Sequence, residues 1–330
     1  MRTVPTEAAT VGNGPRSGEA VVACVVVTYN PDPVRLRQLL DAVLPQVNDV
    51  RLIDNGSGGE ALACLRGLCD ARLQLVELGD NKGIAAAMNV GIAAARAAGC
   101  SHVLLLDHDS VPAPSMVADL LHALAIVQPD GRGGVAAAGP RYLDERQDNP
   151  PPFIRVRGLR VQRCPCPTPD TIVEVDYLIS SGSLIPSATF DAVGGMAEEL
   201  FIDYVDIEWG LRARRLGFQS YGVCAARMAH DLGDAPIEFM GRRLPVHSPL
   251  RHYYHFRNAV WLYRSADLPL YWKCADGWRL LLKYGFYTLF GRPRSEHFRM
   301  MSRGVFDGLR GRMGRLGKAS SAADRTASRG

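Results

Sequence analysis

The chain has 330 residues, of which 47% are hydrophobic and 22% are charged, so it can bury one large core or two modest ones and is not compositionally disordered. No run of about 18 uncharged apolar residues occurs, because charged residues interrupt the most apolar stretch at 268–290, and we expect no membrane span. The formal net charge is +4 without an aromatic-rich reading motif, so we expect no nucleic-acid partner.

The first residues, 1–19, are polar and lack the apolar core of a secretion signal, which predicts a flexible tail and a cytoplasmic protein. Eight cysteines occur without a C-x-x-C pair or a regular spacing. We therefore expect neither a disulfide framework nor a zinc site, and we interpret Cys164 and Cys166 as incidental thiols.

Short apolar runs then alternate with segments of helical spacing. The strands are predicted at 21–27, 50–53, 73–78 and 103–107, and the helices at 34–44, 61–69, 84–98 and 115–127. This alternation predicts an α/β fold with a doubly wound, mostly parallel sheet, whose ligands bind at the carboxyl ends of the strands. Beyond residue 140 we expect a flexible excursion or irregular strands at 144–170, a strand at 173–186, and a loop entering a helix at 198–216.

Two carboxylates, Asp107 and Asp109, follow the predicted buried strand at 103–107. Crowding them at a strand end costs several kcal/mol unless a cation compensates, and a divalent metal there could grip a diphosphate. The alternative is a polar strand terminus with Asp109 capping the next turn.

Two turns on the same side of the predicted sheet carry polar groups suited to a nucleotide. Asp54 and Asn55 end the second strand, where a carboxylate can accept the imide N–H of a pyrimidine. Asn81 and Gly83 precede an Ala-rich helix start that would admit a nucleotide closely. Ordinary turn chemistry and a helix packing face explain these patterns too.

Three acidic residues, Asp203, Asp206 and Glu208, stand within six positions. One of them could act as a general base on an acceptor hydroxyl, although an acidic first turn favoured by the helix dipole is the simpler alternative. His230 is a lone histidine, which by itself is more often structural.

Further polar and aromatic groups suit an acceptor, a sugar or a diphosphate. Ser181 and Gly182 offer a hydroxyl and backbone N–H groups, and the segment 247–258 mixes aromatic faces with guanidinium forks. A packed aromatic helix would explain part of that segment equally well. The candidates for acceptor or diphosphate contact are Ser181, Gly182, Trp209, Arg251, Tyr254, Arg257 and Asn258.

Several motifs are missing. The chain has no G-x-G-x-x-G after its first strand, no P-loop, no G-x-S-x-G and no H-E-x-x-H. The sequence therefore lacks the motifs that would indicate a dehydrogenase, a P-loop nucleotidase, a serine hydrolase or a zinc protease.

Taken in order, the motifs at 25–31, 54–57, 81–89, 105–110, 181–183, 194–195 and 201–209 resemble glycosyltransferase family 2 over roughly residues 21–265, and most closely its bacterial rhamnosyltransferases. The resemblance implies a GT-A fold, a dTDP-L-rhamnose donor, a Mg²⁺ or Mn²⁺ cofactor and inversion at the anomeric carbon. His108 stands where the rhamnosyltransferase pattern has Gln. Three segments are implied: a tail at 1–19, a catalytic domain at 20–265 and a basic helical extension at 266–330. The catalytic domain is divided into a nucleotide half at 20–140 and an acceptor half at 141–265.

The resemblance also implies roles for single residues. Asp206 matches the catalytic base, Asp109 the metal ligand, and His230 the histidine that completes the metal shell in some members. The residues implied to contact the nucleotide or donor sugar are Thr28, Tyr29, Asn30, Asp54, Asn55, Asn81, Gly83, Asn89 and Asp107.

The C-terminal part is strongly basic, with 13 Lys/Arg against 4 Asp/Glu from residue 271 onward. Its arginines alternate with Phe and Met, a mixture suited to an anionic membrane surface, and a solvated tail is the equally simple alternative. Two other functions stay open: a nucleotidyltransferase that makes an activated sugar, and a non-catalytic membrane scaffold. The sequence leaves three classes of acceptor open: a lipid-linked polysaccharide or other glycan, a glycolipid, and a peptide.

Overall fold

A computed structural model describes residues 20–128, 133–143, 153–158, 160–230, 237–239, 242–244, 247–265 and 268–317. Part of the predicted flexible excursion, 144–152, and the end of the basic extension, 318–330, lie outside the described residues, as does the predicted tail at 1–19.

The first half of the chain forms the predicted parallel sheet. Its strands are β1 (Val22–Thr28), β2 (Asp49–Asp54), β3 (Leu73–Glu77) and β4 (His102–Asp107), arranged in the order β3-β2-β1-β4. Every residue of β1 is buried, as expected for a continuous apolar run that is covered on both faces.

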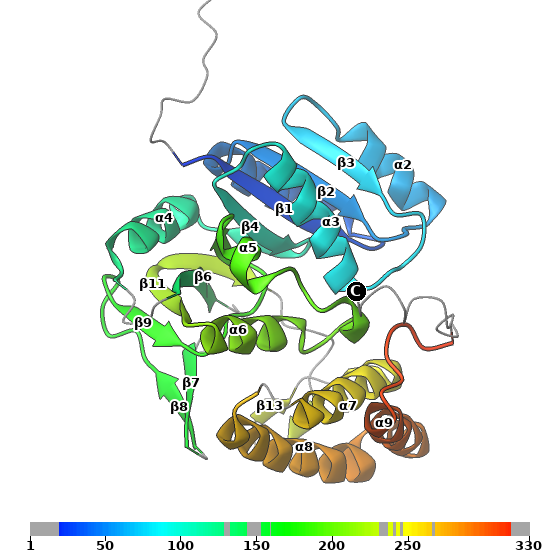
Figure 1. Cartoon of the computed structure of the whole chain (residues 1–330). Helices are drawn as coiled ribbons and strands as arrows, with labels where there is room; N and C mark the ends of the chain where they lie inside the picture. The colour runs from blue at the N-terminus through cyan, green and yellow to red at the C-terminus, as the bar shows by residue number, and fades with distance from the viewer. Residues whose placement is uncertain are drawn as a thin grey trace, which may run out of the picture.

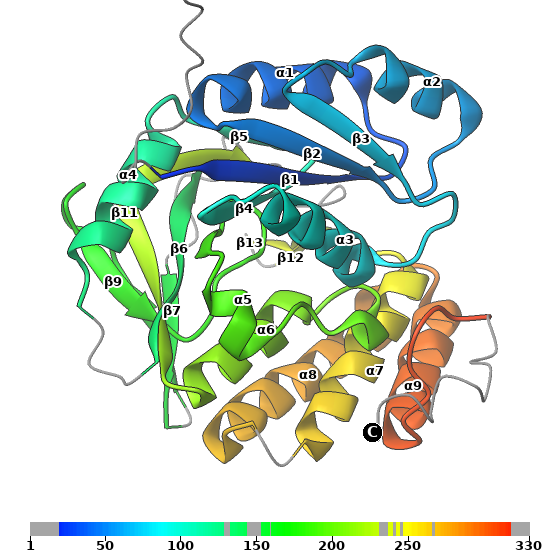
Figure 2. The same ribbon diagram turned by 45° about the horizontal axis from the view of Figure 1, so that its top comes forward.

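Helices cover both faces of this sheet, which confirms the doubly wound arrangement (Figure 2). One hydrophobic core joins the sheet to α1 (Pro33–Val43), α2 (Gly59–Gly67) and α4 (Met116–Ile126), with the short 3-10 turn η1 (Leu44–Gln46) after α1. The other core joins it to α3 (Ile84–Ala97), α5 (Thr189–Val193) and α6 (Val205–Arg215), the last preceded by η2 (Glu198–Leu200).

The second half of the chain extends the sheet irregularly. Beyond β4 the order continues with β10 (Leu184–Pro186), β6 (Gly134–Leu143), β11 (Phe218–His230) and β5 (Ser110–Pro112). The prediction of one strand at 173–186 is wrong, because β9 (Ile172–Val175) pairs with β11 while β10 lies antiparallel to β4 and β6. Two hairpins lie off the sheet, β7 (Phe153–Arg157) with β8 (Arg160–Cys164) and β12 (Ile237–Phe239) with β13 (Arg242–Leu244).

Three C-terminal helices lie side by side below the sheet and α6 (Figures 1 and 2). They are α7 (Pro249–Arg264), α8 (Leu270–Phe290) and α9 (Arg294–Leu309), and they share a core that includes Phe256, Trp272 and Met301. Among the described residues, no helix is both long enough and apolar enough to cross a bilayer.

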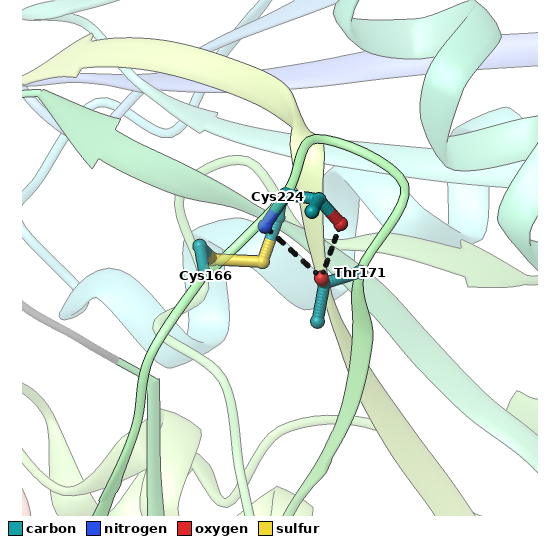
Figure 3. Close-up of a disulfide and its surroundings, with 4 residues drawn as sticks. Cys166, Thr171 and Cys224 are labelled. Atoms are coloured by element: carbon teal, nitrogen blue, oxygen red, sulfur yellow. Dashed lines mark hydrogen bonds between the residues drawn. A yellow bond between two sulfur atoms is a disulfide. The ribbon is translucent and has the colours of Figure 1, made fainter.

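The prediction that the cysteines form no disulfide is wrong for Cys166, which is bonded to Cys224 (Figure 3). The backbone N–H of Cys224 also donates to the Thr171 carbonyl at 3.0 Å, so the loop after β8 is fastened to β11 twice. Cys164, at the end of β8, is buried and free. The two half-cystines are 58 positions apart, so no local pattern in the sequence could reveal this pairing.

Reduction of this disulfide is expected to lower the free energy of unfolding by about 2–4 kcal/mol, because it removes a crosslink that closes a long loop. Urea unfolding with and without dithiothreitol measures the effect. The Cys166→Ser variant should unfold like the reduced protein, and Cys64→Ser, which removes an exposed free thiol, should not. Identical curves for Cys166→Ser and the oxidised wild type would contradict the expectation.

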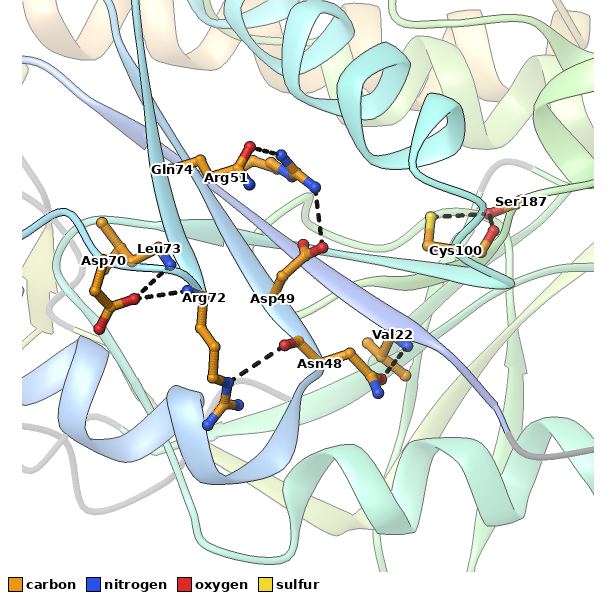
Figure 4. A network of polar contacts seen from close by, with 10 residues as sticks. All are labelled: Val22, Asn48, Asp49, Arg51, Asp70, Arg72, Leu73, Gln74, Cys100 and Ser187. Atoms are coloured by element: carbon orange, nitrogen blue, oxygen red, sulfur yellow. Dashed lines mark hydrogen bonds and ion pairs between the residues drawn. The ribbon is translucent and has the colours of Figure 1, made fainter. Parts of the chain in front are cut away.

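A polar network holds the amino ends of the parallel strands (Figure 4). The Asn48 side chain accepts from the backbone N–H of Val22 at 2.7 Å, and Arg72 donates to the Asn48 carbonyl at 3.3 Å. Arg51 and Asp49 form an ion pair at 3.0 Å. These contacts tie the amino ends of β1, β2 and β3 together, and the predicted site lies at the opposite edge of the sheet.

Candidate active site

The carboxyl ends of three adjacent strands bring the predicted nucleotide residues together. In the parallel register Thr28 lies opposite Asp54, and Val27 lies opposite Asp107. The side chains of Thr28, Asp54 and Asp107, far apart in sequence, therefore project from one edge of the sheet.

The loop after β2 is built around the Asp54 carboxylate. Its oxygens accept from the backbone N–H groups of Gly56 and Ser57 at 3.2 and 3.0 Å and from the Ser57 hydroxyl. Asn30, from the loop after β1, accepts from the Gly58 N–H at 2.8 Å, so the two loops form one wall. Tyr29 stands on this wall with 47% of its surface exposed.

The loop after β3 joins the same wall through paired amides. The Asn55 oxygen accepts from the Lys82 N–H at 2.9 Å, and the Asn81 oxygen accepts from the Gly83 N–H at 3.0 Å. Gly83 has φ of +93° and faces Phe201 so closely that a β-carbon would lie 2.6 Å from its ring. Glycine is therefore required where the start of α3 meets the segment that precedes α6.

Asn89 does not line the nucleotide site in this structure. Its amide accepts from the Met196 N–H at 2.7 Å and donates to the Met196 carbonyl and to Glu198. It fastens α3 to the loop before η2, and we correct its predicted role to a structural one.

The turn after β4 is held by Ser181, whose predicted contact with a ligand is also corrected. The buried hydroxyl of Ser181 accepts from the Asp107 N–H at 3.0 Å and contacts the Ser110 hydroxyl at 2.8 Å. The Gly182 N–H donates to the Leu105 carbonyl at 2.7 Å. Both residues thus position the carboxylates of the turn and offer no surface of their own.

Strand pairing places His230 beside the same turn, because its backbone lies opposite Ser110 in the antiparallel β5–β11 pair. The His230 side chain lies outside the described part of the structure. Among the described residues no three His, Cys, Asp or Glu side chains converge as a metal shell. The donor types at this edge, carboxylates with an imidazole-bearing strand beside them, fit a hard divalent cation.

Asp206 lies in the first turn of α6 and faces this carboxylate edge. Burial raises its pKa from 3.8 to about 6, and the nearby charges of Asp203 and Asp107 add to the rise, while hydrogen bonds from the backbone of residues 206–207 oppose it. The accessible surface leaves Asp206 half-buried, within a mostly apolar pocket that Leu105, Leu178 and Trp209 help to line. A carboxylate tuned this way suits a general base.

The raised pKa of Asp206 has a consequence for stability. The folded state holds this proton more tightly than the unfolded chain does, so stability falls as the pH rises from 3.8 to about 6, and the full loss is present above that pH. Asp206→Asn is therefore expected to raise the melting temperature at pH 8 by about 3 °C and by less at pH 5. Differential scanning calorimetry at both pH values tests this, with exposed Asp41→Asn as the control. A lower melting temperature for Asp206→Asn at pH 8 would contradict the expectation.

The segment before α6 has an unusual backbone, since Phe201, Asp203 and Tyr204 all adopt φ of 63–66°. Such left-handed residues persist only where surrounding contacts hold them. The Asn258 amide nitrogen lies within 2.7–2.9 Å of three carbonyl oxygens of this segment, those of Leu200, Ile202 and Asp203. The Tyr204 hydroxyl donates to Asp276 of α8 at 2.8 Å.

Several predicted acceptor residues belong to this support, and their predicted ligand contacts are corrected. Arg257 is 1% exposed and donates to carbonyls of residues 199, 200 and 314, and Asn258 is completely buried. The buried Tyr254 stacks on Phe201 and accepts from the Leu316 N–H. The Trp209 indole donates to the Gly194 carbonyl at 2.9 Å.

Two charged candidates form ion pairs of different character. Glu208 binds Arg212 through both oxygens at 2.8 and 3.0 Å, which ties it to α6 and argues against a role as base. Arg251 pairs with Asp203 at 3.2 Å while 42% of its side chain stays exposed, so it can still meet an anionic ligand.

Some residues of the site were missed from the sequence. The Tyr142 hydroxyl donates to the Ser181 carbonyl at 2.6 Å, and the pKa of Tyr142 is raised by burial and by the charges of Asp107 and Asp206. Asp276 holds Tyr204 from the C-terminal helices. No local pattern marks either one, because both act over long sequence separations.

Comparisons with known proteins agree with this geometry. The family model described as glycosyl transferase family 2 matches residues 23–167. The dTDP-rhamnosyl transferase RfbF of Shigella flexneri is 29% identical over 292 residues, which cover 88% of this chain and 96% of that protein.

Solved structures share the fold at low sequence identity. GalNAc-T7, solved with UDP, GalNAc and Mn²⁺, is similar with a TM-score of 0.56 and 16% identity over 88% of this chain, which spans only 58% of that longer protein. S. aureus TarS 1-349 is similar with a TM-score of 0.54 and 14% identity, covering 88% of this chain and 82% of its own.

Proposed function

This chain is a glycosyltransferase with a family 2 domain on a GT-A fold and uses a nucleotide-sugar donor, and from that premise we propose that it transfers L-rhamnose from dTDP-L-rhamnose to a hydroxyl group of a glycan or glycolipid in cell-surface biosynthesis. The observation that carries the proposal is the raised pKa of Asp206 beside Asp107, at the strand edge where three nucleotide-binding loops meet. The relative named as a dTDP-rhamnosyl transferase supports the choice of donor.

The donor nucleotide lies on the wall formed by the loops after β1, β2 and β3. Asp54 and Asn55 meet the pyrimidine, Asn81 and Gly83 meet the base and ribose, and Tyr29 offers its exposed ring beside them. Since the loops are already cross-linked by hydrogen bonds, little ordering entropy is lost when the nucleotide binds.

Asp109 and His230 would hold a Mg²⁺ or Mn²⁺ ion at the edge of the site, and Asp107 would face the ribose or the donor sugar. When bound, such an ion offsets the negative charge of the departing diphosphate. Arg251 approaches from α7 and can contribute to the same charge balance.

Asp206 acts as the general base. It takes the proton of the acceptor hydroxyl while that oxygen bonds to the anomeric carbon, and the bond from this carbon to the diphosphate oxygen breaks with its electron pair going to the nucleotide diphosphate. A single displacement inverts the anomeric centre. The pKa of about 6 keeps Asp206 ionised at neutral pH while making it a stronger base than an ordinary carboxylate.

The protein works on the cytoplasmic side of a membrane, which its basic C-terminal helices contact peripherally. Exposed arginines of this region, Arg279, Arg294 and Arg299, lie beside exposed apolar side chains such as Phe298. This combination suits an anionic bilayer surface.

A donor screen by mass spectrometry tests the proposal, comparing dTDP-rhamnose with UDP- and GDP-sugars on a panel of acceptors. We expect a mass gain of one deoxyhexose from dTDP-rhamnose alone. Calorimetric titration with dTDP in the presence and absence of Mn²⁺ tests whether nucleotide binding depends on the metal. Equal dTDP affinity with and without Mn²⁺ would contradict the proposed metal site. Transfer from UDP- or GDP-sugars, with none from dTDP-rhamnose, would overturn the donor assignment.

A further inference from the structure

A second pocket lies between α7 and α8, on the helical side of the molecule. Its cavity volume is about 310 Å³, at the lower end of the range for small-molecule sites. Its walls combine apolar groups, among them Phe256, Leu282 and Phe286, with the side chains of His252, His255 and Lys283. Nothing in the proposed chemistry at Asp206 uses this pocket.

The polar groups of the pocket are arranged around one cation. The Lys283 ammonium lies 3.0 Å from Nε2 of His255 and donates to it, so this imidazole is neutral. Burial lowers the pKa of His255 well below its ordinary value, in agreement with that assignment. Lys283 is exposed at the mouth and can donate to an anion as well.

His252 has a buried ring nitrogen that is available to a ligand. Its ring is 2% exposed, and its Nδ1 lies 2.9 Å from Nδ1 of His297, while Nε2 is a buried nitrogen without a hydrogen-bond partner among the described residues. An orphaned buried polar atom of this kind is costly unless a ligand meets it. A phosphate group can offer both an oxyanion to Lys283 and, in its singly protonated form, an O–H to His252.

The mouth of the pocket opens onto an apolar stripe. Trp278, Leu281, Leu282 and Leu289 follow helical spacing along the outer side of α8 and are 54–62% exposed. Leu282 belongs both to the stripe and to the pocket wall. A chain of methylene or isoprenoid units that leaves the pocket would therefore meet apolar side chains and not water.

The pocket also adjoins the catalytic segment. The His255 ring lies 4.9 Å from the ring of Tyr204, and Arg251, one turn earlier on α7, pairs with Asp203 at 3.2 Å. Tyr204 is two residues from Asp206, so a ligand held between α7 and α8 adjoins the segment that leads into the proposed base.

We propose that the pocket between α7 and α8 binds a phosphate or diphosphate group carried on an apolar chain, as the anchored end of a lipid-linked acceptor. Its role as an acceptor subsite rests on the proposed glycosyl transfer, whereas the binding itself does not. The cation, the buried imidazole and the continuous apolar surface each match one part of such a ligand.

Calorimetric titration of the full chain with farnesyl phosphate, below its micelle concentration, tests the binding. Inorganic phosphate supplies the charge alone and farnesol the chain alone, and we expect each to bind at least about tenfold more weakly than farnesyl phosphate. Lys283→Ala should weaken farnesyl phosphate about tenfold, the loss of one charge-assisted contact. Arg37→Ala, which removes an exposed charge on α1, should leave it unchanged.

Equal affinity of wild type and Lys283→Ala, or equal affinity for farnesol and farnesyl phosphate, would overturn the proposal. Binding that weakens equally in Lys283→Ala and Arg37→Ala would reflect general charge attraction and would overturn the proposal too. The binding of dTDP to the same proteins is measured in parallel. If the wild type binds farnesyl phosphate but transfers no sugar, the proposed function is wrong and the proposed binding site still stands.

Discussion

Replacing Asp206 by Asn is expected to lower kcat for sugar transfer by about 100-fold or more, with the Kd for the donor changed by less than about twofold. Asparagine keeps the oxygen that accepts from the Ile207 N–H at 2.9 Å, so the first turn of α6 should stay in place. It cannot take a proton from the acceptor hydroxyl. Quenched-flow measurement of transfer and calorimetric measurement of donor binding separate the two effects.

The pH dependence of the same reaction follows from the raised pKa of Asp206. Because only the ionised carboxylate is a base, kcat/KM of the wild type should fall as the pH decreases through about 6. Asp203→Asn removes a neighbouring charge that contributes to the rise, so its profile should move to lower pH.

Glu208→Gln is the matched control for Asp206, since Glu208 lies in the same helical turn and pairs with Arg212. It should keep the pH profile of the wild type. Full transfer activity in Asp206→Asn would remove Asp206 from the role of base, and a large loss in Asp203→Asn alone would assign that role to Asp203.

Local pattern was sufficient to predict the nucleotide half of the fold. Each strand from β1 to β4 is a short apolar run, and the register of those strands alone brings Asp54 and Asp107 to one edge. The alternation of strand and helix specifies this edge before any tertiary contact is known. The acceptor half has no such repeat, and the short β10 was therefore merged with β9 in the sequence-based prediction.

The sequence did not distinguish side chains that meet a ligand from those that hold the site. Arg257 and Asn258 are residue types that often bind phosphate and sugar groups. In this structure both donate hydrogen bonds to backbone carbonyls more than fifty positions away. The same long separation concealed the disulfide between Cys166 and Cys224. Polar groups buried by distant segments have no local periodicity that could reveal them.

The C-terminal helices act on the catalytic segment as a clamp. Asn258 and Arg257 of α7 hold the carbonyls of residues 199–203, and Asp276 of α8 holds Tyr204. These helices thus have a structural part in the site, because they hold the left-handed backbone that precedes Asp206.

Asn258→Leu tests this clamp and should lower both stability and turnover. Leucine has a similar volume but removes the side-chain donor of the Ile202 and Asp203 carbonyls, while Arg257 still donates to the Leu200 carbonyl. The loss should cost about 3 kcal/mol in the free energy of unfolding. Once the left-handed residues relax, Asp206 leaves its position, and we expect kcat to fall at least about tenfold with the Kd for donor nearly unchanged.

The control for Asn258→Leu is Asn48→Leu, which removes a structural amide at the opposite edge of the sheet. This variant should lose stability while its folded fraction keeps the wild-type kcat. A purely structural role for Asn258 would give the same result in both variants. The positioning role predicts instead that only Asn258→Leu alters the pH profile, since a displaced Asp206 loses the burial that raises its pKa and the midpoint moves below about 6.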